Sequence, residues 1–130
     1  EGRKIFDENI FMFYEDNDLS EQIGLMGLDK IILSDCFIYH QGEASSSATP
    51  FITALKNFHY GWSESYFTQK YQSSKAAKWK NFLSATKYLK RTVLFSVTFN
   101  INRLIPSWYR LKGKISFMRD KKAQDIKEYF

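Results

Sequence analysis

The sequence predicts a helix-rich α+β chain, and three observations support this prediction. Apolar residues recur every three or four positions over residues 16–27 and over much of 51–90, which is the period of an amphipathic helix. Between these segments, residues 30–40 are rich in β-branched and aromatic side chains, which is typical of short strands. The chain has 130 residues, of which 44% are hydrophobic and 25% charged, as expected of a folded domain.

The first predicted helix covers residues 16–27. Asp16 or Asp18 can cap its N-terminus, because a carboxylate there accepts a hydrogen bond from a free backbone N–H group. Gly27 is placed to end the helix, since glycine adopts the left-handed conformation of a helix C-terminus at low cost.

A short β-rich region follows this helix. Residues 30–34 and 36–40 are predicted to form one kinked strand or two short strands. Residues 42–50 are mostly small and include three consecutive serines and a closing proline, which is typical of a loop. We place the domain boundary in this loop, so the chain divides into residues 1–47 and a basic, aromatic, helical extension, residues 48–130.

The extension is predicted to be largely helical. Its apolar stripes are formed by Phe51, Leu55, Phe58 and Trp62, and then by Trp79, Phe82, Leu83 and Leu89. Segment 92–105 fits both an alternating strand and a helical stripe, and the helical context on both sides favours a helix. Pro106 is expected to break this segment, because proline lacks the N–H group that continues a helix.

Charge is divided unevenly along the chain. Residues 1–43 hold ten acidic and three basic residues, whereas residues 44–130 hold four acidic and sixteen basic residues. Clustered carboxylates suit cation binding and acid–base chemistry, and a basic region suits an anionic partner. A membrane surface fits the basic region with its tryptophans; a solvated helical face around a packed core is the alternative. Nucleic acid is disfavoured, because the acidic segment would repel phosphate.

The expected location is the cytoplasm. The single cysteine, Cys36, excludes an internal disulfide and fits a reducing compartment. No signal peptide is evident, and the longest uncharged stretch of the C-terminal half, residues 92–102, is too short to span a bilayer. The basic extension can still contact the inner face of the cell membrane peripherally.

The chemistry-bearing residues concentrate in an acidic segment and a later histidine. Asp16 and His40 flank the predicted helix and strand, which can bring both to one end of a sheet. A carboxylate and an imidazole together can bind a divalent cation or transfer a proton. Each also has a structural explanation, since Asp16 and Asp18 can be helix caps and His40 can be a core histidine.

Residues 6–20, Phe-Asp-Glu-Asn-Ile-Phe-Met-Phe-Tyr-Glu-Asp-Asn-Asp-Leu-Ser, resemble the bacterial family 2 glycosyltransferases, especially the rhamnosyltransferase-like members. In that family Phe-Asp-Glu precedes Glu-Asp-x-Asp-Leu, and a helix ending in Gly, a strand, and a His before a small-residue loop follow. Gly27 and His40 stand here in the same order. The resemblance is dense over residues 5–47 and weaker over residues 60–71.

The resemblance implies that the chain is the C-terminal part of a GT-A enzyme, whose Rossmann-like α/β domain transfers a sugar with inversion. Asp16 would be the general base that takes the proton of the acceptor hydroxyl. Glu15 would help to position the acceptor, and Asp18 would support the helix start. His40 would bind a divalent cation, Mg²⁺ or Mn²⁺, together with the diphosphate. The loop near the donor phosphates would comprise Ser45, Ser46 and Ser47.

The implied substrates are a nucleoside-diphosphate sugar and a hydroxyl of a saccharide or lipid-linked acceptor in cell-surface polysaccharide synthesis. The family's Asp-x-Asp motif and nucleotide-binding half precede the Glu-Asp motif, so residues 1–130 alone are expected to be inactive. The alternative is a non-enzymatic basic helical module that serves binding or oligomerisation.

Overall fold

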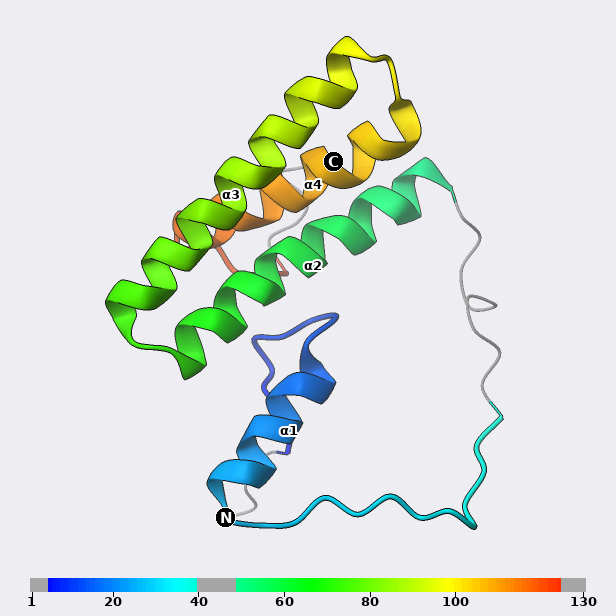
Figure 1. Cartoon of the computed structure of the whole chain (residues 1–130), viewed down its shortest axis with the longest axis vertical. Coiled ribbons are helices and arrows are strands. Elements are labelled where there is room, and N and C mark those ends of the chain that lie inside the picture. The colour runs from blue at the N-terminus through cyan, green and yellow to red at the C-terminus, as the bar shows by residue number, and fades with distance from the viewer. Residues whose placement is uncertain (1–4, 40–48, 125–130) are drawn as a thin grey trace.

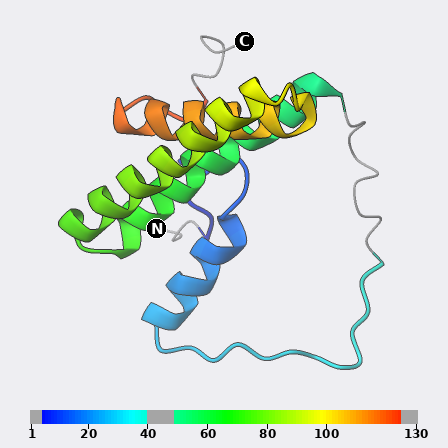
Figure 2. The ribbon, with the colours of Figure 1, turned by 45° about the horizontal axis from the view of Figure 1, so that its top comes forward.

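The computed structural model describes residues 5–39 and 49–124, and this part of the chain contains four α-helices (Figure 1). They are α1 (Glu15–Leu25), α2 (Pro50–Tyr71), α3 (Ser74–Val97) and α4 (Ile101–Met118). Helix α4 packs against both α2 and α3, so these three form a bundle, and the segment that precedes α1 lies against α2 (Figures 1 and 2). None of the described helices has the length and apolar character needed to cross a membrane.

The α+β prediction is wrong, because the described residues form no strand. Residues 30–34 and the described part of 36–40 are irregular, with a turn at Ser34 and Asp35. A strand is stabilised by hydrogen bonds to a neighbouring strand, and the described chain offers none. The side chains of Ile32 and Ile38 are 96% and 92% exposed, so they lack the side-chain packing through which β-branched residues stabilise a strand.

Helix α1 forms close to its predicted position, but its N-terminus differs from the prediction. The N-cap is Tyr14, at a φ of 69°, and no side chain caps the helix there. Asp16 and Asp18 therefore lie inside the first turn, where a negative charge complements the positive end of the helix dipole. Gly27 adopts a φ of 68° just beyond the helix, as predicted.

Two glycines set the crossing of α2 and α4. A Cβ atom on Gly61 would lie 2.2 Å from the carbonyl oxygen of Arg110, and one on Gly113 would lie 2.1 Å from that of Phe58. The two backbones are therefore in direct contact, which only glycine permits at these positions. This contact fixes α2, which in turn carries the residues that hold the acidic segment.

The C-terminal half corrects one prediction and supports another. The helix favoured for residues 92–105 is correct for residues 92–97 and 101–105, but the structure divides it, because α3 ends at Val97 and residues 98–100 form a turn before α4. Pro106 does not break the next helix, because α4 begins at Ile101 and continues through the proline to Met118. Proline inside a helix loses the hydrogen bond to the carbonyl four residues earlier, here that of Asn102, and crowds that carbonyl, yet α4 continues where it packs against α2 and α3.

Candidate functional site

One lysine of α2 joins two ends of the acidic segment, residues 7–18. The Lys70 Nζ atom lies 2.7 Å from Asp7 Oδ2 and 2.7 Å from Asp18 Oδ1. Asp18 is only 1% exposed, and a buried carboxylate needs both a counter-charge and hydrogen bonds. The ion pairs therefore fasten the segment to α2 at both of its ends.

Hydroxyl and amide donors complete the environment of the two carboxylates. The Tyr66 hydroxyl donates to Asp7 Oδ2 at 2.8 Å, and the Tyr71 hydroxyl donates to Asp18 Oδ1 at 2.8 Å. Gln22 Nε2 donates to Asp18 Oδ2 at 2.6 Å from within α1. We refer to Asp7, Asp18, Tyr66, Lys70 and Tyr71 as the Lys70 network.

Asp7 and Lys70 are both charged at neutral pH. Burial alone would raise the pKa of the Asp7 carboxyl, but hydrogen bonds, chiefly from Lys70, lower it to about 2. Burial would lower the pKa of Lys70, but hydrogen bonds and charges from Asp18 and Asp7 raise it above its ordinary value. The lysine is therefore an ammonium ion wherever the fold is intact.

Aromatic packing fixes the middle of the acidic segment. The Tyr14 ring lies between those of Tyr60 and Phe67, with centroid distances of 5.5 Å and 5.3 Å. The Ser63 hydroxyl donates to the Met12 carbonyl at 2.8 Å. Tyr14 has a positive φ, which is unfavourable for a bulky residue and persists where surrounding contacts hold it. Docking on α2 thus determines where α1 begins.

The three acidic residues of the predicted site occupy different environments. Asp16 is exposed, and its side chain forms no hydrogen bond or ion pair with any described residue. Glu15 is half-buried, and its Oε2 atom is shielded from solvent without a hydrogen-bond partner in the described structure. Asp18 is buried in the Lys70 network, so its side chain is an anchor between α1 and α2.

The predicted cation and phosphate residues lie outside the described part of the chain. These are His40, Ser45, Ser46 and Ser47. Over residues 5–39 and 49–124 no three His, Cys, Asp or Glu side chains come together in a way that would hold a metal ion. The described residues therefore do not form a cation site by themselves.

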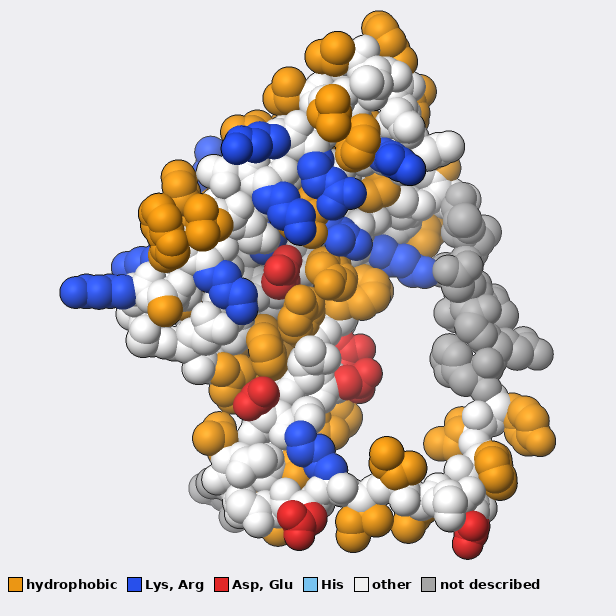
Figure 3. All heavy atoms as spheres, in the orientation of Figure 1, with side chains coloured by type: hydrophobic (Ala, Val, Ile, Leu, Met, Phe, Trp, Pro, Cys, Tyr) orange, Lys and Arg blue, Asp and Glu red, His pale blue; other side chains and the backbone are white. Residues whose placement is uncertain are grey.

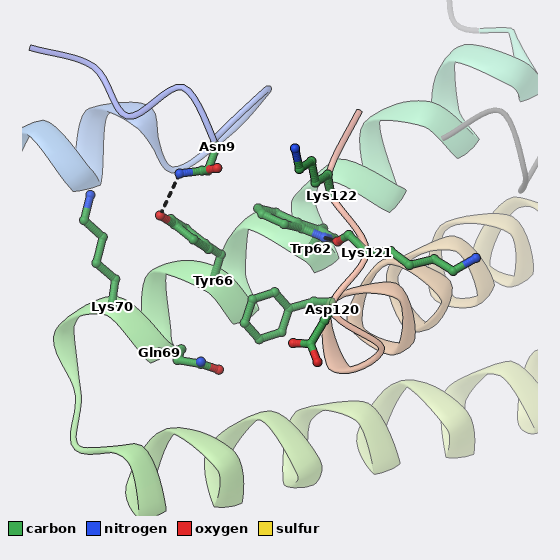
Figure 4. A pocket seen from close by; sticks show the side chains of 9 residues that line it. Asn9, Trp62, Tyr66, Gln69, Lys70, Asp120, Lys121 and Lys122 are labelled. Atoms are coloured by element: carbon green, nitrogen blue, oxygen red, sulfur yellow. Dashed lines mark hydrogen bonds between the residues drawn. The ribbon is translucent and has the colours of Figure 1, made fainter. Parts of the chain in front are cut away.

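Two cavities flank Lys70. The first has a volume of about 420 Å³, and Figure 4 shows its aromatic wall on α2 opposite Asp120 of the segment after α4. Trp62 and Tyr66 stack there, with a centroid distance of 5.2 Å and an angle of 15° between rings. The second, of about 600 Å³, lies against Gln22 of α1. Asp16 lines neither cavity.

Sequence reasoning missed the residues that hold the acidic segment. Tyr66 and Lys70 are four residues apart on α2, so the sequence already places them on one helical face, with Tyr71 next to Lys70 in the chain. Their role was not apparent because the carboxylates that they bind come from a distant part of the sequence. The weak resemblance over residues 60–71 covers this stretch of α2.

No family model, curated protein or solved structure matches this chain. The functional conclusion therefore depends on the residues themselves and on their geometry.

Proposed function

We propose that this chain is the acceptor side of an inverting glycosyltransferase, which moves a sugar from a nucleoside-diphosphate sugar to a saccharide or lipid-linked acceptor. One observation carries the proposal: the carboxylates of one segment, docked on α2, are in two different states. Asp7 and Asp18 are ion-paired with Lys70, whereas Asp16 is exposed and unpaired within the described residues. A general base needs an ionised, accessible carboxylate on a fixed support. The resemblance over residues 6–20 points to the same function.

Asp16 would act on the hydroxyl of the acceptor. A neutral hydroxyl is a poor nucleophile, so the carboxylate accepts its proton as the oxygen attacks the anomeric carbon. The new bond forms from the face opposite the leaving group, and the bond to the diphosphate breaks with its electron pair. The products are an inverted glycoside, a nucleoside diphosphate and a protonated Asp16, which then releases its proton to water.

Glu15 is suited to positioning the acceptor. Its Oε2 atom is shielded and has no hydrogen-bond partner among the described residues, which is uncommon for a buried carboxylate oxygen. A second hydroxyl of the acceptor would satisfy this oxygen and orient the reacting hydroxyl toward Asp16. The Lys70 network supports both roles, because it holds the first turn of α1 against α2.

The donor half of the site would come from residues that precede Glu1 in the parent protein. The apolar side chains that follow α1 support a contact with another part of that protein, because exposed apolar surface of this kind marks interaction sites. Ile31, Ile32 and Phe37 are 79%, 96% and 81% exposed. We propose Mg²⁺ or Mn²⁺ as the cofactor, with His40 as one ligand and the others outside the described residues; it would neutralise the diphosphate.

The test is Asp16→Asn in the polypeptide that includes the preceding residues. We expect turnover to fall by about 10²- to 10⁴-fold, the usual contribution of a general base, while donor binding stays unchanged. Release of nucleoside diphosphate from a panel of UDP-, GDP- and dTDP-sugars measures turnover. Asp29→Asn is the matched control, because Asp29 is also an exposed carboxylate and lies outside the acidic segment.

Two results would contradict the proposal. Near-normal turnover by the Asp16→Asn enzyme would show that another group takes the proton. Turnover of a sugar nucleotide by residues 1–130 alone would show that the donor site does not require the preceding residues.

A further inference from the structure

The end of α3, the turn that follows it and the first residue of α4 form an apolar tip, residues 93–101. Five of its large hydrophobic side chains are exposed, whereas Phe95 is buried. The exposed fractions are 56% for Val93, 56% for Leu94, 72% for Val97, 88% for Phe99 and 63% for Ile101. Figure 3 shows these hydrophobic atoms gathered at the end of the α3–α4 hairpin, away from α1.

Phe99 occupies a backbone position that favours glycine. Its φ is 52°, and the Asn100 N–H donates to the Phe95 carbonyl at 3.0 Å across the end of α3. This left-handed turn commonly holds glycine after a helix, because a side chain there is sterically unfavourable. Fold stability alone would therefore select a small residue, yet the chain presents a phenylalanine to solvent.

Three arginines line a cavity directly beside the tip. The cavity has a volume of about 440 Å³ and is lined by Arg91 of α3 and by Arg103 and Arg110 of α4. Arg91 and Arg103 lie on the ring of Phe95, each with its guanidinium carbon 5.9 Å from the centroid. Arg110 donates from Nε to Asn57 Oδ1 at 2.8 Å. We call this cavity the arginine pocket.

No carboxylate compensates these charges. Helices α3 and α4 together contain ten Lys and Arg residues and no Asp or Glu. Within the described residues, none of the three arginines forms an ion pair with an acidic side chain. Figure 3 shows Lys and Arg side chains over α3 and α4 just below the apolar tip. Guanidinium groups that have no carboxylate partner and line one cavity are suited to bind a phosphate.

We propose that the α3–α4 tip binds the surface of an anionic phospholipid membrane. Phe99 and the neighbouring apolar residues enter the boundary between headgroups and acyl chains, and the arginine pocket binds a lipid phosphate. Stable attachment of a peripheral protein requires two such signals, apolar insertion and electrostatic attraction, and both occur at this tip. A bilayer is favoured over a protein partner because a projecting apolar end with basic residues below it matches the layers of a membrane. This binding is independent of the proposed transferase activity.

The first test removes the apolar insertion without harming the fold. We expect Phe99→Gly to leave the melting temperature unchanged or raised, because glycine relieves the left-handed turn. Its partition onto vesicles of phosphatidylglycerol and phosphatidylcholine should fall about tenfold, the effect of losing one buried aromatic side chain. Phe82→Gln is the control, because Phe82 is also an exposed phenylalanine but lies within α3, away from the tip. This control should bind vesicles normally.

The second test removes the phosphate site. Arg91→Gln with Arg103→Gln should weaken binding to the anionic vesicles by more than tenfold and reduce the preference over pure phosphatidylcholine vesicles. Normal binding by both the Phe99 and the arginine variants would refute the proposal. So would protection of the pocket by inorganic phosphate without any vesicle binding, which would assign it to a soluble phosphate. Displacement of the protein from vesicles by duplex DNA at physiological salt would assign the basic face to nucleic acid and would likewise overturn it.

Discussion

The Lys70 network and the arginine pocket are both built around basic side chains, but they use them in opposite ways. In the network, one lysine neutralises two carboxylates, and Tyr66 and Tyr71 donate the remaining hydrogen bonds. In the pocket, three arginines surround a cavity, and no described carboxylate pairs with them. Paired charges join parts of the fold, whereas unpaired charges remain available to a ligand.

This difference indicates which region tolerates substitution. Removing one member of a buried charge pair leaves its partner buried without compensation, which is strongly unfavourable. Removing an exposed charge that has no partner changes stability little. The acidic segment should therefore depend on Lys70 for its structure, while the arginine pocket can be altered with little cost to the fold.

The largest effect is expected from Lys70→Met. The variant leaves the ionised Asp7 and the buried Asp18 without their cation, and we expect docking of the acidic segment to weaken by about 3 kcal/mol. This value is at the lower end for buried pairs, because Tyr71 and Gln22 still donate to Asp18. Hydrogen exchange should show protection lost in α1 while α3 and α4 keep theirs.

Lys75→Met is the matched control for this prediction. Lys75 lies in the first turn of α3, is exposed, and forms no ion pair with the described residues. We expect its removal to change stability by less than about 0.5 kcal/mol. Equal effects of the two substitutions would show that Lys70 does not hold the segment.

Lowering the pH should destabilise the part of the fold around the acidic segment but leave the arginine pocket unchanged. His59 lies on α2 against Phe11 of the acidic segment, with a centroid distance of 4.7 Å, and is only 1% exposed. Burial lowers the pKa of His59 from 6.5 to about 4. Between pH 6.5 and pH 4 the His59 imidazole binds a proton in the unfolded chain but not in the folded chain. The free energy of unfolding therefore falls as the pH drops from 6.5 to 4, by at most about 1.4 kcal/mol per pH unit.

His59→Leu tests this contribution. The variant should lose stability less steeply than the wild type between pH 6.5 and 4, as measured by urea unfolding at a series of pH values. Asp7 then contributes at lower pH: its depressed pKa stabilises the fold above pH 3.8, and that contribution is lost as the pH falls toward 2. Parallel curves for the wild type and His59→Leu would show that the imidazole is protonated equally in both states. The arginine pocket should not respond, because guanidinium groups stay charged throughout.

The acidic helix could be predicted from sequence, but the role of Asp18 could not. The terminal glycine and the acidic first turn are local signals, and both appear in the structure as α1 and Gly27. Helix capping is also predicted from local sequence, and that prediction was wrong in making Asp18 a candidate N-cap residue. Its partners Lys70 and Tyr71 lie on α2, so only the packed fold shows that this carboxylate is an anchor.

Helix α3 shows a second limit of sequence reasoning. Its bulky apolar stripe is exposed, with values of 62% for Trp79 and 53% for Phe82, while a different face packs in the bundle. That buried face is formed by Ala77, Asn81, Ala85, Tyr88, Thr92 and Phe95. Periodicity predicts that a helix has distinct faces, but it does not tell which face meets a neighbour. The predicted strands failed similarly, because β-propensity needs a partner strand to take effect.

The smallest effect is expected where the pocket charges are removed. The three guanidinium groups repel one another, so Arg91→Gln with Arg103→Gln should raise the free energy of unfolding slightly, by up to about 0.5 kcal/mol. Thermal melts in low salt should show this gain, and it should disappear in high salt because salt screens the repulsion between exposed charges. A loss of more than about 1 kcal/mol would mean that these arginines hold α3 to α4, as Lys70 holds the acidic segment to α2. A variant that keeps its stability but no longer binds anionic vesicles would instead show that these arginines serve ligand binding, whereas Lys70 serves the fold.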